Sequence, residues 1–105
     1  MKLEGTYIQY AAGYDKDDIS KSDIEKALKD LTEMDDEHGA FWVGVYGADT
    51  REFVLEIHKS LSLFGNFGED ENYKIQIQNL DSSKEYFDLL LSGSIEELKK
   101  KLKNN

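Results

Sequence analysis

The acid–base chemistry that this sequence could support rests on Glu56 and His58, which are two residues apart in an alternating apolar–polar run. If this run forms a β-strand, both side chains project from the same face and are neighbours. Enzymes use a carboxylate beside an imidazole for proton transfer. However, the pair is accompanied by no serine nucleophile elbow, no phosphate-cradling glycine loop and no second paired carboxylate. We therefore predict no catalytic residues, and an enzyme or small-ligand binder using this Glu56–His58 face is the less favoured hypothesis.

The other group of ligand-type side chains is the acidic run from Asp35 to His38. Consecutive side chains at a helix end diverge and cannot converge on one ion, and the spacing matches neither a zinc-binding histidine pair nor an EF-hand. The chain contains no cysteine, which excludes disulfides, thiolate metal sites and thiol nucleophiles. We predict no metal and no cofactor, and we interpret the run as a solvated helix end.

The elements that position these residues follow from the hydrophobic periodicity. Alternation predicts strands within the first ten residues and over residues 41–46, 52–58 and 73–78. Apolar residues at three- and four-residue intervals predict helices. Three capping-box pairs mark their starts: Ser22 with Glu25, Ser82 with Glu85, and Ser94 with Glu97. Gly39 and Gly93 mark helix ends. The order β-α-β-β-β-α-α predicts one α+β domain over residues 1–105. We expect a two-layer sandwich with helices on one face of a mostly antiparallel sheet of about four strands.

One face of this sheet is expected to stay open. If the helices cover the side of Phe41, Phe53 and Ile75, the opposite side carries Trp42, Tyr46, Val54, Glu56, His58, Lys74, Gln76 and Gln78. Tryptophan and tyrosine are enriched where proteins bind partners. The alternative is that the first strand or a loop partly covers Trp42.

The segment from Lys59 to Asn72 is predicted to be a long connection between two strands. It combines apolar residues with the acidic run Glu69, Asp70 and Glu71. Connections of this length are functional or are ordered by their own side chains. We interpret the segment as an apolar-tipped, acidic-flanked binding loop; the alternative is a compact loop that tucks Leu63 and Phe64 under the sheet edge.

The charge of the chain limits the class of partner. Its 22 acidic and 13 basic residues give a net charge of −9. Such a body repels phosphate backbones, so we expect no nucleic-acid or anionic-membrane binding, while a basic protein partner is allowed. Acidity also simply keeps small proteins soluble. The first ten residues lack the pattern of a secretory signal, and no stretch approaches the length of a membrane span, which favours the cytoplasm.

The segment Asp36-Glu37-His38 leading into Phe41-Trp42-Val43, together with Phe53-Val54-Leu55-Glu56 in a small acidic chain, resembles the immunity proteins of bacterial polymorphic toxin systems. These include the contact-dependent growth inhibition type. The resemblance implies a cytosolic protein that binds a cognate toxin domain, often a basic nuclease, and blocks it.

Charge, open face and resemblance together predict a protein-binding inhibitor, as a monomer or homodimer, rather than an enzyme. An adaptor or regulatory module for another protein is the alternative. The predicted partner-binding residues lie on the open face and in the 59–72 segment: Trp42, Tyr46, Glu56, His58, Phe64, Phe67, Glu69, Asp70 and Glu71.

Overall fold

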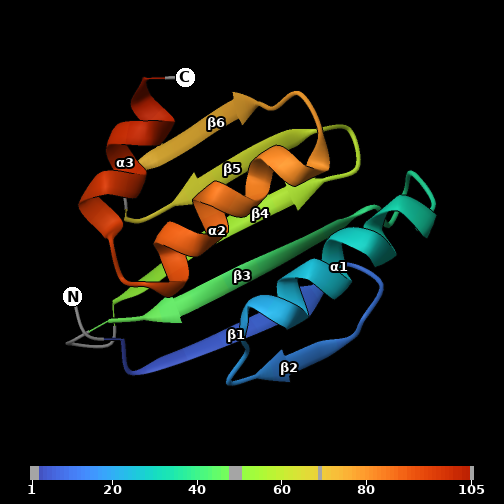
Figure 1. Ribbon diagram of the computed structural model, residues 1–105, viewed down its shortest axis with the longest axis horizontal. Coiled ribbons are helices and arrows are strands. Elements are labelled where there is room, and N and C mark those ends of the chain that lie inside the picture. The colour runs from blue at the N-terminus through green and yellow to red at the C-terminus, as the bar shows by residue number, and fades with distance from the viewer. Residues whose placement is uncertain (1–2, 48–50, 69, 105) are drawn as a thin grey trace.

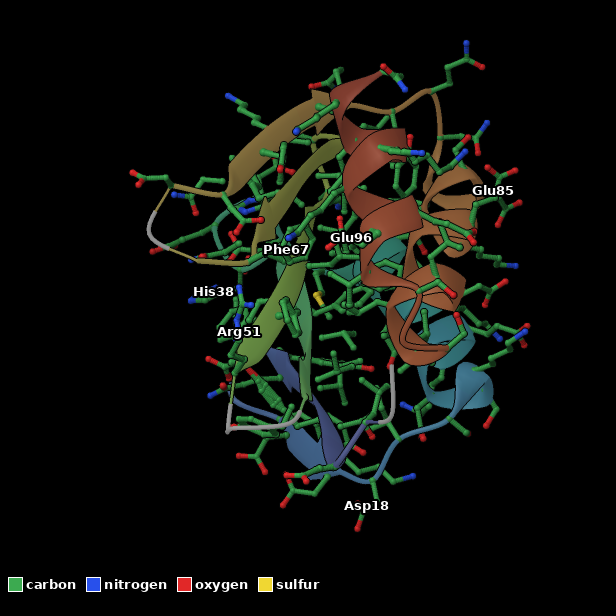
Figure 2. The ribbon with its side chains drawn as sticks, turned by 90° about the vertical axis from the view of Figure 1, so that its left-hand side faces the viewer. Asp18, His38, Arg51, Phe67, Glu85 and Glu96 are labelled. Carbon is green, nitrogen blue, oxygen red and sulfur yellow. The ribbon has the colours of Figure 1, made fainter. Side chains whose placement is uncertain are left out.

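A computed structural model describes residues 3–47, 51–68 and 70–104 of the chain. In these ranges three α-helices pack on one face of an antiparallel sheet of six strands (Figures 1 and 2). The α+β class is confirmed, and the sheet has more strands than the predicted four. No helix in the described ranges is long and apolar enough to cross a bilayer.

The strand order in the sheet is β2-β1-β3-β4-β5-β6, with every neighbouring pair antiparallel. The strands are β1 (Gly5–Tyr10), β2 (Asp15–Asp17), β3 (Ala40–Tyr46), β4 (Glu52–His58), β5 (Ser62–Asn66) and β6 (Asn72–Gln76). Sequence neighbours therefore pair throughout, except that β1 pairs with β3 after the chain has passed through α1 (Lys21–Glu33).

Two of these strands were not predicted. β2 consists of three exposed charged residues, so it carries no apolar alternation. β5 lies inside the 59–72 segment, so the prediction that this segment is a long loop connecting two strands is wrong. Its pattern is hidden by Gly65, where a β-carbon would lie 2.9 Å from Leu102 Cδ1. The Leu102 side chain of α3 (Ile95–Lys103) packs against the strand at this point, which accounts for a glycine in the middle of a short strand.

The helices differ from the predictions mainly at their ends. The N-cap of α1 is Ser20, two residues before the expected Ser22, because Asp23 accepts the Ser20 backbone N–H at 2.9 Å. It ends at Glu33 rather than at Gly39. A 3-10 turn (Leu80–Ser83) precedes α2 (Lys84–Leu91), and α3 follows Ser94 as predicted.

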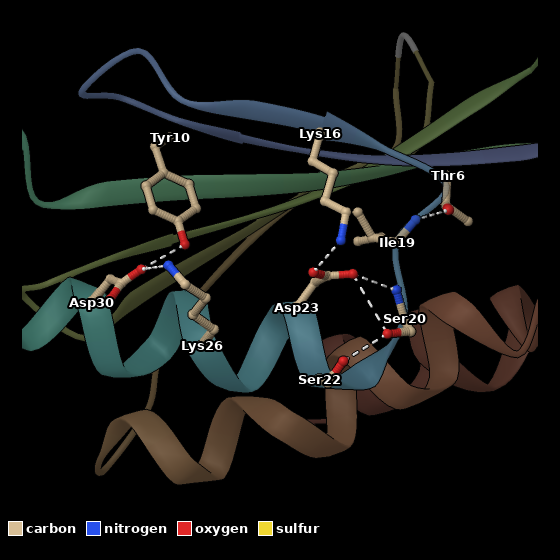
Figure 3. A network of polar contacts seen from close by, with 9 residues as sticks. All are labelled: Thr6, Tyr10, Lys16, Ile19, Ser20, Ser22, Asp23, Lys26 and Asp30. Atoms are coloured by element: carbon tan, nitrogen blue, oxygen red, sulfur yellow. Dashed lines mark hydrogen bonds and ion pairs between the residues drawn. The ribbon is translucent and has the colours of Figure 1, made fainter.

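The core lies between the two layers. The predicted side of the sheet is the covered one: Phe41 stacks on Phe87 of α2 with ring centroids 5.7 Å apart. Polar contacts attach α1 to the first hairpin, since Tyr10 donates to Asp30 at 3.0 Å and Lys16 pairs with Asp23 at 2.8 Å (Figure 3). The helices therefore leave the opposite face of the sheet uncovered, as the edge-on view shows (Figure 2).

Candidate functional site

The open face of the sheet is formed by the side chains that alternate with the core residues along each strand. The register aligns one residue from each of the six strands in a row across this face, namely Asp15, Gln9, Trp42, Glu56, Phe64 and Lys74. The structure thus places Phe64, predicted to lie in a loop, beside Glu56 and on the same surface as Trp42.

The centre of the open face is a cluster of four half-buried side chains: Trp42, Glu56, His58 and Phe64. His58 Nε2 and Glu56 Oε2 are 2.5 Å apart, and the imidazole meets the Phe64 ring edge-on at 5.0 Å. The Trp42 indole N–H donates to Gln9 Oε1 at 3.2 Å, so β1 contacts this ring while part of it stays exposed. We call these four residues the central cluster. It presents aromatic surface in which the indole N–H of Trp42 and the facing atoms of Glu56 and His58 have hydrogen-bond partners.

The contacts of His58 bear on the enzyme hypothesis. Ser62 lies at the start of β5, directly after the turn that begins at His58, and its hydroxyl is therefore a candidate nucleophile for this pair. Its Oγ lies 3.2 Å from Gln76 Oε1, to which it donates. A serine nucleophile would need its hydroxyl directed to the imidazole. The Ser62 hydroxyl is therefore directed to β6, and the contact of the Glu56–His58 pair on the β5 side is the Phe64 ring.

The second part of the open face is an acidic recess of about 460 Å³ at the β1–β2 end, lined by Tyr7, Gln9, Asp15, Asp17, Tyr46 and Glu52, with backbone from Ile8. Only Tyr46 among these was predicted from the sequence. Gly44 in the middle of an aromatic strand is the signal that could have revealed it, because such a glycine marks a close approach. The Tyr7 ring lies across Gly44, where a β-carbon would be 2.3 Å from Tyr7 Cζ.

The acidic recess has a fixed internal geometry. Tyr7 reaches over β3 and donates its hydroxyl to Glu52 Oε2 at 2.7 Å. Its ring meets the Tyr46 ring edge-on at 5.7 Å. Burial raises the pKa of the Tyr7 phenol above its ordinary value, and the Glu52 carboxylate raises it further. The charge of Glu52 also raises the pKa of Tyr46, so both phenols stay protonated and able to donate.

The remaining predicted residues do not join this face. Phe67 is 1% exposed and packs in the core between Phe53 and Tyr73, so its inclusion among the partner-binding residues is corrected: its ring has no surface to offer. Glu71 pairs with Lys99 and with Arg51 (3.8 Å).

The hydrogen bond from Lys99 holds the pKa of the Glu71 carboxyl below its usual value. Asp70 is exposed, and Glu69 lies outside the described residues. The acidic run is thus split: Glu71 links the β5–β6 connection to α3 through Lys99, while its side chain stays partly exposed.

The Asp35–His38 run forms a closed turn after α1. Asp35 Oδ1 accepts the His38 backbone N–H at 2.7 Å and lies 3.1 Å from His38 Nδ1. The backbone hydrogen bond lowers the pKa of Asp35. Within the described ranges, no three histidine, aspartate or glutamate side chains are gathered as metal ligands would be.

Comparison of the chain with protein-family models, with curated proteins and with solved structures gave no match.

Proposed function

We propose that the protein is a stoichiometric inhibitor that binds a basic protein domain, in the manner of an immunity protein, with the open face of its sheet. The observation that carries the proposal is the composition of this face. An uncovered face of an antiparallel sheet is normally polar, yet this one presents the aromatic central cluster next to an acidic recess. Aromatic groups surrounded by charge are typical of protein interfaces.

The charge of the open face supports a basic partner. Its described side chains include four carboxylates and one lysine, which are Asp15, Asp17, Glu52, Glu56 and Lys74. Lys74 itself lies over the Phe64 ring, 5.5 Å from its centroid. A surface of this sign accelerates encounter with a basic protein, and its effect falls with rising salt.

The size of the open face also suits a specific complex. Six strands at a spacing of about 4.8 Å give a width of roughly 24 Å, and the strands other than the three-residue β2, with five to seven residues each, give a length of roughly 20 Å. A standard interface buries about 800 Å² of accessible surface on each partner. These dimensions give a projected area of about 480 Å², so the face can supply the centre of such an interface, and residues around its edges must supply the remainder.

The test is binding to the captured partner. The tagged protein, used as bait in its own host, is expected to retain one basic polypeptide in equimolar amount that is toxic when expressed alone. Trp42→Ala is expected to weaken this complex by about 30-fold, as loss of an aromatic hot spot does. The matched control is Tyr14→Ala, which removes another exposed aromatic ring (49% exposed) on the helix side, beside Tyr10 and Lys26.

Equal affinity of the Trp42→Ala and Tyr14→Ala variants would exclude the open face as the interface. Retention that does not change between low and high salt would instead favour an adaptor with an uncharged partner. A bait that forms a salt-sensitive homodimer, dissociated by Trp42→Ala, would assign the open face to a second copy of this chain.

A further inference from the structure

The acidic recess holds negative charge that the described part of the chain does not neutralise. Asp15, Asp17 and Glu52 form no ion pair with any side chain in the described ranges. The lysine of the same hairpin, Lys16, points to the opposite face and pairs with Asp23 at 2.8 Å. Like charges held on one small surface repel, so a cation placed among them is stabilised.

The recess is also aromatic and pre-formed. The Tyr7 ring is held by its contact across Gly44 and by its hydrogen bond to Glu52, while Tyr46 remains 40% exposed beside it. Carboxylates therefore flank two phenol rings on strands that the hydrogen-bonded sheet holds in place. A site of this kind offers charge pairing and ring stacking to the same ligand group.

We propose that the acidic recess is a subsite for one arginine side chain of the partner protein. The proposal rests on the function proposed above and adds the chemistry of one contact. Guanidinium fits better than ammonium, because its planar fork pairs with carboxylates in two places and stacks on aromatic rings. The occupant enters at the β1–β2 end of the open face, so the arginine fixes the orientation of the partner relative to the central cluster.

The experiment uses a peptide in place of the partner. The isotope-labelled full chain is titrated with acetyl-Gly-Arg-Gly-amide and with the same peptide carrying citrulline, the uncharged analogue of arginine, or lysine. The backbone amide shifts of Tyr7, Asp17 and Tyr46 report on the recess, and the Trp42 indole reports on the central cluster. The arginine peptide is expected to bind at the recess about tenfold more tightly than the citrulline peptide.

Two matched variants locate the site. Asp17→Asn with Glu52→Gln is expected to abolish the preference for arginine, whereas Glu25→Gln with Glu97→Gln, which removes the same charge from exposed positions on α1 and α3, is expected to keep it. Equal binding of the arginine and citrulline peptides would overturn the proposal, and so would an unchanged preference in the recess variant. Thermal unfolding of both variants shows that each remains folded.

The outcome separates this proposal from the proposed function, because the peptide titration requires no partner. If the Trp42→Ala variant no longer retains the partner but the unmodified chain shows no preference for the arginine peptide, the subsite is refuted and the inhibitor function stands. A clear arginine preference with no basic partner retained would support the subsite and refute the function.

Discussion

Replacing Gly44 with alanine tests whether the Tyr7 ring is held across β3. A β-carbon at residue 44 would lie 2.3 Å from Cζ, 2.4 Å from Cε1 and 2.5 Å from the hydroxyl oxygen of Tyr7. Non-bonded atoms do not approach so closely, so the ring must swing away from the sheet. The hydrogen bond to Glu52 then breaks, and the edge-on contact with Tyr46 is lost.

The expected magnitude follows from these losses. A hydrogen bond to a charged group contributes about 1.5 kcal/mol or more, reduced to about 1 kcal/mol here because Glu52 is exposed to solvent. The aromatic pair adds about 0.5 kcal/mol. Alanine in a strand offsets about 0.5 kcal/mol of this loss, because glycine is entropically unfavourable there. The free energy of unfolding should therefore fall by about 1 kcal/mol, which lowers Tm by about 4–8 °C in a domain of this size.

The assay is a double-mutant cycle with Tyr7→Ala, measured by urea denaturation and far-UV circular dichroism. In the Tyr7→Ala background no ring has to move, so Gly44→Ala should become neutral or stabilising by about 0.5 kcal/mol. Gly5→Ala is the control, because a β-carbon there makes only an ordinary contact of 3.4 Å with Tyr46. Equal destabilisation by Gly44→Ala in both backgrounds would refute the account of the Tyr7 contact.

Three further predictions concern other parts of the fold. Phe67→Ala should lower the free energy of unfolding by about 3–5 kcal/mol, because it opens a cavity in the core. Urea denaturation measures this loss, and a loss below about 1 kcal/mol would contradict the burial of Phe67. Burial, with the hydrogen bond to Asp30, raises the pKa of Tyr10. The stabilisation that the protonated Tyr10 phenol provides is therefore complete below the ordinary tyrosine value near 10 and is lost as the pH rises above it. Tyr10→Phe should remove the part of the alkaline destabilisation that comes from this phenol, which a series of Tm values from pH 8 to 12 would show. Lys99 lowers the pKa of Glu71, so the stabilisation by this pair is complete above the ordinary glutamate value of 4.5 and is lost as the pH falls through the lowered pKa. Glu71→Gln should therefore lower Tm more at pH 7 than at pH 2.5, and equal losses at the two pH values would exclude the ion pair as the cause.

Sequence reasoning recovered the features that hydrophobic alternation encodes. Phe41 and Phe53 alternate with polar or amphipathic neighbours, so both the covered face and the open face followed from period two. It failed where another constraint outweighed the pattern. Gly65 occupies an inward position because α3 approaches β5 closely, and a glycine in a short run looks like a loop.

Sequence reasoning did not predict the acidic recess, for a different reason. Its residues come from four strands and meet only through the register of the sheet, and Asp15 and Asp17 lie in a strand with no apolar residue at all. Phe67 was misassigned to the surface because an apolar residue in an acidic, glycine-containing segment gives no sign of the direction in which it points. In the fold its ring closes the end of the core against Phe53.

The two edges of the sheet are not equivalent, and this bears on self-assembly. At one edge β2 offers only three residues, alternating acidic and basic, which is too short and too charged to template an incoming strand. At the other edge β6 is five residues long and carries Tyr73 and Ile75, with Lys74 as its single cation. Ordered growth by strand addition, including fibril formation at high concentration, is therefore expected to start from β6 and to stop at β2.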